Sequence, residues 1–177
     1  VVHTGGTTGS PKGVMLTDRN FNSIAKQFTT YDFLCHRGEK LLNIMPPFIA
    51  YGYACGVHLP LTLGIRVIII PNVDPAKLGS LLLKYKPQHM FGVPAHYQQL
   101  ALDPRLRNKD LSFIRMYAAG GDAISVGAEQ SVNDFLAAHG VEFPLAKGYG
   151  MTEISSAATA AAASINKPGS VGIPLVD

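Results

Sequence analysis

Eleven residues near the amino terminus, from His3 to Gly13, combine four glycines, three threonines and one lysine. Glycine lets a backbone approach a bulky anion closely and adopt positive φ without a Cβ clash. Successive amides in such a turn form a concave donor surface, to which threonine hydroxyls add further donors. Lys12 supplies a mobile positive charge that follows a phosphate group. The segment therefore predicts a polyphosphate-binding loop.

This loop differs from the two common phosphate-binding motifs. A Walker loop requires Gly-Lys-Ser/Thr, whereas Lys12 lies between Pro11 and Gly13. The dinucleotide fingerprint requires Gly-x-Gly-x-x-Gly, which Gly5 to Gly9 does not match. A flexible surface turn between two strands is the alternative for any glycine-rich stretch.

Three segments together resemble the adenylate-forming, or AMP-binding, enzymes, which include acyl-CoA synthetases, luciferases and the adenylation domains of peptide synthetases. The first is Thr4 to Val14, the second is Gly148-Tyr149-Gly150-Met151-Thr152-Glu153, and the third and weaker is Gly120 to Ser125. The resemblance runs from Val1 to Pro174, and acyl-CoA synthetases are the most similar members. It implies that a carboxylic acid, fatty or aryl, reacts with ATP and Mg²⁺ to give an acyl-adenylate, which then forms a thioester with CoA.

The resemblance also implies a role for each motif residue. Tyr149 would stack on the adenine ring, with Gly121, Asp122 and Ala123 on its other side, and Gly150 would also bind the nucleotide. Thr152 would bind the α-phosphate and Glu153 would ligate Mg²⁺. Lys12, Thr152 and Glu153 would be catalytic, and the β- and γ-phosphates would be held by Lys12 together with Thr4, Gly5, Gly6, Thr7, Thr8 and Gly9.

Simpler interpretations exist for three of these side chains. Tyr149 also fits an ordinary buried tyrosine, and Asp122 fits a turn residue. Glu153 also fits a carboxylate at a helix amino terminus, where it interacts favourably with the helix dipole. The position of these residues behind a phosphate-binding loop favours the functional interpretation.

The sequence departs from the family pattern at two positions. Gly5 stands where a serine is usual, which removes one hydroxyl donor but keeps the backbone amides. Ile49, in the segment Pro46 to Gly52, stands where a histidine is common. Because isoleucine donates no hydrogen bond, that contact to substrate is either absent or supplied by another residue.

Alternating strand and helix patterns predict an α/β fold with a mostly parallel sheet and helices on both faces. Thr17, Asp74 and Ser125 are expected to precede helices, and Gly64 and Gly140 to end them. Further helices are expected at 53–63 and 95–102, and strands at 41–45, 66–70, 90–93, 113–118 and 142–146. The second and third motifs would then follow strands at one rim of the sheet, where ligands of such folds bind.

Three segments of mostly small or apolar residues are expected to form the acid pocket: 51–58, 93–97 and 155–163. Within the last of them, the alanine-rich tract 157–163 has two interpretations of equal weight. Alanine has a high helix propensity, which favours a helix. Small side chains would alternatively leave room for substrate along a pocket wall.

The composition of the 177 residues excludes several classes of protein. A net charge of +3 without a basic stripe argues against nucleic acid binding, and the apolar runs are too short to span a bilayer. No signal peptide is apparent, and Cys35 and Cys55 are expected to be unpaired thiols in a cytoplasmic protein. The histidines and cysteines form no zinc-type pattern.

We expect residues 1–177 to be a single α/β fragment of an AMP-binding domain, without the small carboxyl-terminal domain of the family and nearly inactive alone. Two alternatives stay open. One is an adenylation domain that loads a carrier protein in place of CoA. The other is a non-catalytic nucleotide-binding relative, which Ile49 would favour.

Overall fold

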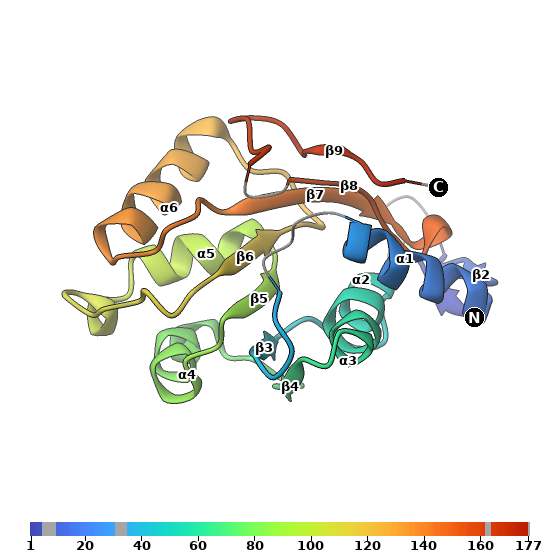
Figure 1. Cartoon of the computed structure of the whole chain (residues 1–177), viewed down its shortest axis with the longest axis horizontal. Coiled ribbons are helices and arrows are strands. Elements are labelled where there is room, and N and C mark those ends of the chain that lie inside the picture. Colours follow the sequence, from blue (N-terminus) through green and yellow to red (C-terminus); the bar gives the residue numbers. More distant parts are fainter. Residues whose placement is uncertain (5–9, 31–34, 162–163, 177) are drawn as a thin grey trace.

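The fold is built on a seven-stranded sheet (Figure 1). The structure, a computed structural model, describes residues 1–4, 10–30, 35–161 and 164–176. Five strands run parallel, and the last two pair antiparallel at one edge. In spatial order the strands are β4 (Arg66–Ile69), β3 (Lys40–Asn43), β5 (His89–Gly92), β6 (Met116–Ala119), β7 (Ala146–Met151), β8 (Ser156–Ala160) and β9 (Ile173–Pro174).

Helices cover both faces of this sheet, as predicted (Figure 1). One face carries α1 (Asp18–Thr30), α2 (Ala50–Tyr53) and α3 (Leu59–Thr62); the other carries α4 (Leu78–Tyr85), α5 (Pro94–Ala101) and α6 (Val126–Ala138). A separate apolar cluster fills each interface between sheet and helices. The expected fold class is therefore confirmed.

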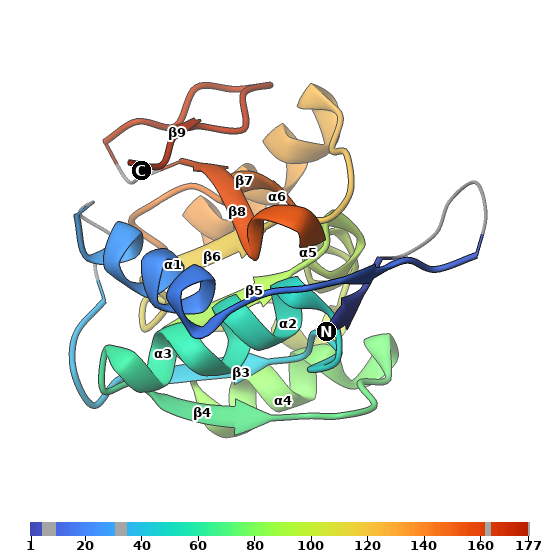
Figure 2. The same cartoon turned by 90° about the vertical axis from the view of Figure 1, so that its right-hand side faces the viewer.

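Short elements connect and flank these layers. A two-stranded antiparallel hairpin, β1 (Val2–His3) and β2 (Gly13–Val14), precedes α1 and lies beside the α2 end of the molecule (Figure 2). Three 3₁₀ turns are η2 (Pro75–Lys77), η3 (Pro104–Leu106) and η4 (Thr152–Ile154). Between α2 and α3 the helix widens into a π-helical segment, η1 (Ala54–His58). Pro60 follows it, lacks an amide donor and would clash with the carbonyl group four residues earlier in a regular α-helix.

Three predicted helix starts are confirmed by side-chain caps. The Thr17 hydroxyl accepts a hydrogen bond from the Asn20 amide at 3.4 Å, and the Ser125 hydroxyl accepts one from the Ala128 amide at 3.3 Å. The Asp74 carboxylate accepts one from the Ala76 amide at 3.0 Å. These bonds satisfy amides that have no partner within the helix.

Gly64 and Gly140 end their helices as expected, with φ of 71° and 81°. The left-handed backbone conformation at this position causes little strain in glycine because glycine has no Cβ.

The expectations for the carboxyl-terminal third were partly wrong. The strand expected at 142–146 begins only at Ala146, so Tyr149 and Gly150 lie inside β7 and do not follow it. The alanine-rich tract is mainly the strand β8, not a helix. Pairing of β8 with both β7 and β9 supplies hydrogen bonds to its backbone, which outweighs the helix propensity of alanine.

Neither cysteine forms a disulfide: Cys35 is half-buried and Cys55 is buried. Within the part of the chain that the structure describes, none of the helices has the length and apolar character needed to cross a bilayer.

Replacing Leu82 with alanine is expected to lower the free energy of unfolding by about 2–5 kcal/mol, because Leu82 is fully buried in the cluster under α4 to α6 and its removal leaves a cavity. Urea unfolding measures the change. Leu102→Ala is the matched control, since Leu102 is 78% exposed and should change stability by only about 0.5 kcal/mol. Equal effects of the two substitutions would contradict the assignment of the core.

Candidate active site

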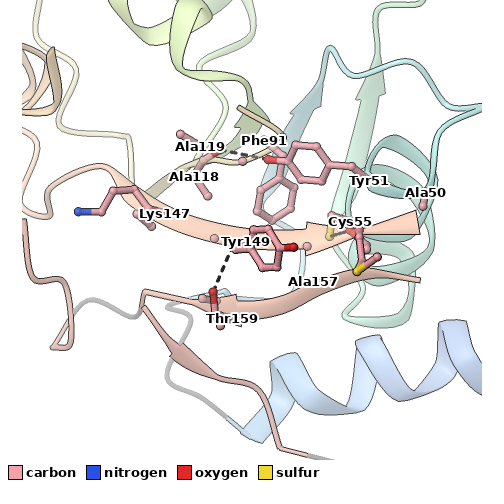
Figure 3. Close-up of a pocket in the computed structure, with 18 of the residues that line it drawn as sticks. Ala50, Tyr51, Cys55, Phe91, Ala118, Ala119, Lys147, Tyr149, Ala157 and Thr159 are labelled. Atoms are coloured by element: carbon pink, nitrogen blue, oxygen red, sulfur yellow. Dashed lines mark hydrogen bonds between the residues drawn. The ribbon is translucent and has the colours of Figure 1, made fainter. Parts of the chain in front are cut away.

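A cavity of about 260 Å³ lies at the carboxyl ends of β5 and β6, against β7, β8 and α2. This is the rim at which parallel α/β sheets bind ligands. Figure 3 shows Tyr51, Phe91 and Tyr149 around it. The residues that line it are His3, Phe28, Ile49, Ala50, Tyr51, Cys55, Phe91, Met116, Ala118, Ala119, Gly120, Gly121, Ala146, Lys147, Gly148, Tyr149, Gly150, Met151, Thr152, Ser156, Ala157, Thr159, Ala160 and Ala161.

Hydrogen bonds hold the aromatic wall formed by Tyr51 in place. Its hydroxyl lies 3.3 Å from the carbonyl oxygens of both Gly92 and Ala118, at the ends of β5 and β6. Its ring lies beside that of Phe91, with centroids 6.2 Å apart. Burial raises the pKa of the Tyr51 phenol well above its usual value, so this group stays a neutral donor to the carbonyl groups.

Two glycines let β8 approach β7 closely along the opposite wall. A Cβ on Gly150 would lie 1.4 Å from the Ser156 carbonyl oxygen, and one on Gly148 would lie 3.0 Å from that of Thr159. The pairing register shifts between Tyr149 and Gly150. The packing of one strand on the other thus requires glycine at position 150 and leaves little room for a side chain at Gly148, whatever their contact with a ligand.

Tyr149 lies between these glycines and is 54% exposed, so it is not the buried tyrosine of the simpler interpretation. Its amide donates a hydrogen bond of 3.2 Å to the Thr159 hydroxyl (Figure 3). The Thr159 hydroxyl in turn donates to the Val171 carbonyl group at 2.8 Å. These bonds fix the backbone while the ring stays accessible. An accessible aromatic face beside a cavity is suited to stacking on a planar ring.

Of the predicted site residues, Gly121, Tyr149, Gly150 and Thr152 come together around the cavity. Asp122, Ala123, Lys12 and Glu153 are exposed and do not line it. The Asp122 carboxylate accepts a hydrogen bond from the Ala123 amide at 2.7 Å.

Thr4 closes the base of the β1–β2 hairpin, where its hydroxyl accepts a hydrogen bond from the Lys12 amide at 3.1 Å. Gly5, Gly6, Thr7, Thr8 and Gly9 lie outside the described residues.

The expectations for the acid pocket agree with the cavity in part. The segment 51–58 contributes Tyr51 and Cys55, and Ser156, Ala157, Thr159, Ala160 and Ala161 come from the third segment. No residue of 93–97 lines the cavity. For the alanine-rich tract, the interpretation as a pocket wall fits the structure.

A buried ion pair behind the cavity was not predicted from the sequence. The Lys147 ammonium group donates to the Glu129 carboxylate of α6, and both side chains are less than 5% exposed. Lys147 also donates to the Lys167 carbonyl oxygen at 3.1 Å, and Glu129 accepts from the Gly169 amide at 3.1 Å. The pair therefore joins α6, β7 and the segment that leads to β9. The sequence offered one indication of this ion pair, a lysine within a strand of mostly small residues. The partner could not be identified, because it lies 18 residues away in the sequence.

A second buried polar contact lies on the cavity wall, where the Cys55 sulfur is 3.2 Å from the Ser156 hydroxyl oxygen. Burial raises the pKa of the Cys55 thiol to about 11, and the hydrogen bond with Ser156 lowers it by a smaller amount. The group is thus a neutral thiol at pH 7 and adds no charge to the cavity.

Among the described residues, no cluster of three or more histidine, cysteine or acidic side chains is arranged to hold a metal ion. Glu153 is exposed and forms no ion pair with another described residue. One accessible carboxylate is compatible with Mg²⁺, which takes one or two carboxylates and completes its shell with water and phosphate oxygens.

The model of the AMP-binding enzyme family matches residues 1–177. The chain belongs to this family. All three motifs lie within the matched range, and two of them, together with His3 immediately before the first, contribute to the cavity.

Curated relatives of this AMP-binding chain include several acid–CoA ligases. It is 35% identical over 174 residues to a long-chain-fatty-acid–CoA ligase of Bacillus subtilis, an alignment that covers 97% of this chain and 30% of the relative. It is 31% identical over 179 residues to an anthranilate–CoA ligase of Pseudomonas aeruginosa, covering 98% of this chain and 32% of the relative. The chain thus spans about a third of the length of these relatives.

Solved structures share the same fold. ATP-bound MatB from Rhodopseudomonas palustris superposes with a TM-score of 0.83 at 25% identity, covering 99% of this chain and 33% of that one. The anthranilate CoA ligase AuaEII, in complex with anthranoyl-AMP, gives a TM-score of 0.85 at 21% identity, covering 98% and 33%. The second likeness shows the fold alone.

Replacing Glu129 with glutamine is expected to lower the free energy of unfolding by about 3–5 kcal/mol, because it leaves the buried Lys147 ammonium group without its counter-charge. Urea unfolding measures this change in free energy. Glu142→Gln makes the same substitution at an exposed glutamate and serves as the control. The double variant Glu129→Gln/Lys147→Gln should cost less than the sum of the two single changes. Strictly additive losses would show that the two groups do not interact.

Proposed function

We propose that the whole protein activates a carboxylic acid with ATP, forming an acyl-adenylate and pyrophosphate, and then transfers the acyl group to CoA. The observation that carries the proposal is the convergence of His3, which immediately precedes the first motif, with Gly120–Gly121 and Tyr149–Thr152 on one cavity. The acid–CoA ligases among the relatives support the thioester step.

The first step needs alignment more than acid–base chemistry. A carboxylate oxygen attacks the α-phosphorus of ATP, and the bond from that phosphorus to the bridging oxygen breaks as pyrophosphate leaves. Because the nucleophile is already an anion, no general base is required, and the protein contributes positioning and neutralisation of charge. In the second step the CoA sulfur attacks the acyl carbon and AMP leaves.

The residues of the site are suited to these tasks. Tyr149 offers its ring to adenine, beside Gly150 and opposite Gly121, Asp122 and Ala123. Thr152 offers a hydroxyl to the α-phosphate, while Lys12 and the Thr4–Gly9 segment hold the departing phosphates. Glu153 would hold Mg²⁺, which neutralises phosphate charge when bound.

The walls of the cavity indicate the class of acid. Phe91, Met116 and Ala160 are buried, and Ala118 lies beside them. Such walls favour an uncharged fatty or aryl tail because they offer no partner for a charged group. We further propose that these 177 residues are one part of an AMP-binding domain and that residues outside them complete the enzyme, which we place in the cytoplasm.

Tyr149→Ala is expected to weaken ATP binding about tenfold to a hundredfold, since stacking of a base on an aromatic ring contributes about 1–3 kcal/mol. Tyr149→Phe keeps the ring and should bind like the native protein. Calorimetric titration with ATP measures both variants. An alanine variant that binds as tightly as the phenylalanine variant would exclude stacking on this ring.

Acid-dependent exchange of labelled pyrophosphate into ATP tests the reaction itself, on the whole protein with a panel of fatty and aryl acids. Exchange followed by thioester formation with CoA is expected. Exchange with transfer to a carrier protein, and none to CoA, would instead indicate the carrier-loading alternative. ATP binding without exchange for any acid would indicate a non-catalytic relative.

A further inference from the structure

The side chains that line the cavity differ in whether their polar atoms are already engaged. Among the described residues, the Lys147 ammonium group is held by Glu129 and the Lys167 carbonyl group. The Thr159 hydroxyl donates to the Val171 carbonyl group. The Tyr51 hydroxyl faces two carbonyl groups, and Cys55 and Ser156 bond to each other. The Lys147 charge is thus paired with a carboxylate, and each of the other groups already has a partner within the protein.

Three lining side chains make no such hydrogen bond within the described part of the chain: His3, Tyr149 and Thr152. The phenol and the hydroxyl are neutral groups. Of the three, only His3 presents a ring N–H donor. His3 is exposed at the end of β1, immediately before the glycine-rich segment, so solvent and ligands reach it.

The proposed reaction brings two anions, the carboxylate and the α-phosphate, against each other in this cavity. Their mutual repulsion rises as water is removed, because the effective dielectric constant falls. A hydrogen-bond donor near both groups reduces this repulsion, and a hydrogen bond to an anion is stronger than one between neutral groups. Ile49, which lines the same cavity, has no donor to offer.

We propose that His3 donates a hydrogen bond to the reacting anions, the acid carboxylate and the α-phosphate, and so supplies the donor that Ile49 lacks. The inference rests on the proposed function. His3 transfers no proton in this step; its ring N–H positions the carboxylate. It belongs to the glycine-rich hairpin, which gives this hairpin a contact with the acid as well as with the phosphates.

The test compares His3→Leu, which removes the donor, with His3→Gln, which keeps one, in the pyrophosphate exchange assay on the whole protein. His3→Leu is expected to lower kcat/KM for the acid about tenfold to a hundredfold. His3→Gln should lose about threefold or less, because a neutral donor remains. His36→Leu is the control, as an exposed histidine that does not line the cavity.

A second variant tests the role of the cavity directly. Because Ile49 and His3 line the same space, Ile49→His introduced into His3→Leu should restore at least part of the lost activity. Urea midpoints of all variants should match the native value, since the His3 side chain is exposed.

Exchange by His3→Leu at the native rate would overturn the proposal, as would equal losses in the leucine and glutamine variants without rescue by Ile49→His. These outcomes leave the proposed function intact, because the native protein still exchanges. Failure of the native protein to exchange with every acid would instead reject the proposed function.

Discussion

The buried ion pair between Lys147 and Glu129 is the constraint on which the arrangement of the site depends. Each charge is nearly removed from water, and such burial is tolerated only when partners satisfy it. Here the partners come from α6, from β7 and from the segment containing Lys167 and Gly169. One interaction therefore sets the position of three parts of the chain that are distant in sequence.

The consequence for the site follows from the alternation of side chains along β7. Lys147 and Tyr149 are two residues apart and point to the same face of the strand. Lys147 is held beneath α6, whereas Tyr149 lies farther along the strand, at the cavity, with its ring exposed. The backbone at Tyr149 is further held by the hydrogen bond to Thr159 and by the close packing of β8 against the two flanking glycines. An accessible ring is thus carried by a strand with little freedom to move.

The sequence predicted those features that depend on local chemistry. Thr17, Asp74 and Ser125 were expected to cap helices because their side chains bond to amides two or three residues away, and they do so. The alternation of strands and helices was sufficient to predict the parallel sheet and its two helical layers. The placement of Gly121, Tyr149 and Thr152 around one cavity also followed the motifs.

Features that depend on distant parts of the chain were missed. Residues 157–160 form a strand because β7 and β9 pair with them, which alanine propensity does not reveal. The partner of Lys147 could not be read from spacing, since the two residues meet only after α6 packs on the sheet. The same holds for His3 and Ile49, whose shared cavity results from the position of the hairpin beside α2.

The mutual bond of Cys55 and Ser156 has a further chemical effect. By bonding to each other, these two groups do not stand as unpaired polar atoms in a part of the wall whose other side chains are mainly apolar. A mixed anhydride between acid and phosphate is prone to hydrolysis. Under the proposed function, an acyl-adenylate beside this mainly apolar part of the wall would meet fewer ordered water molecules than one in open solvent.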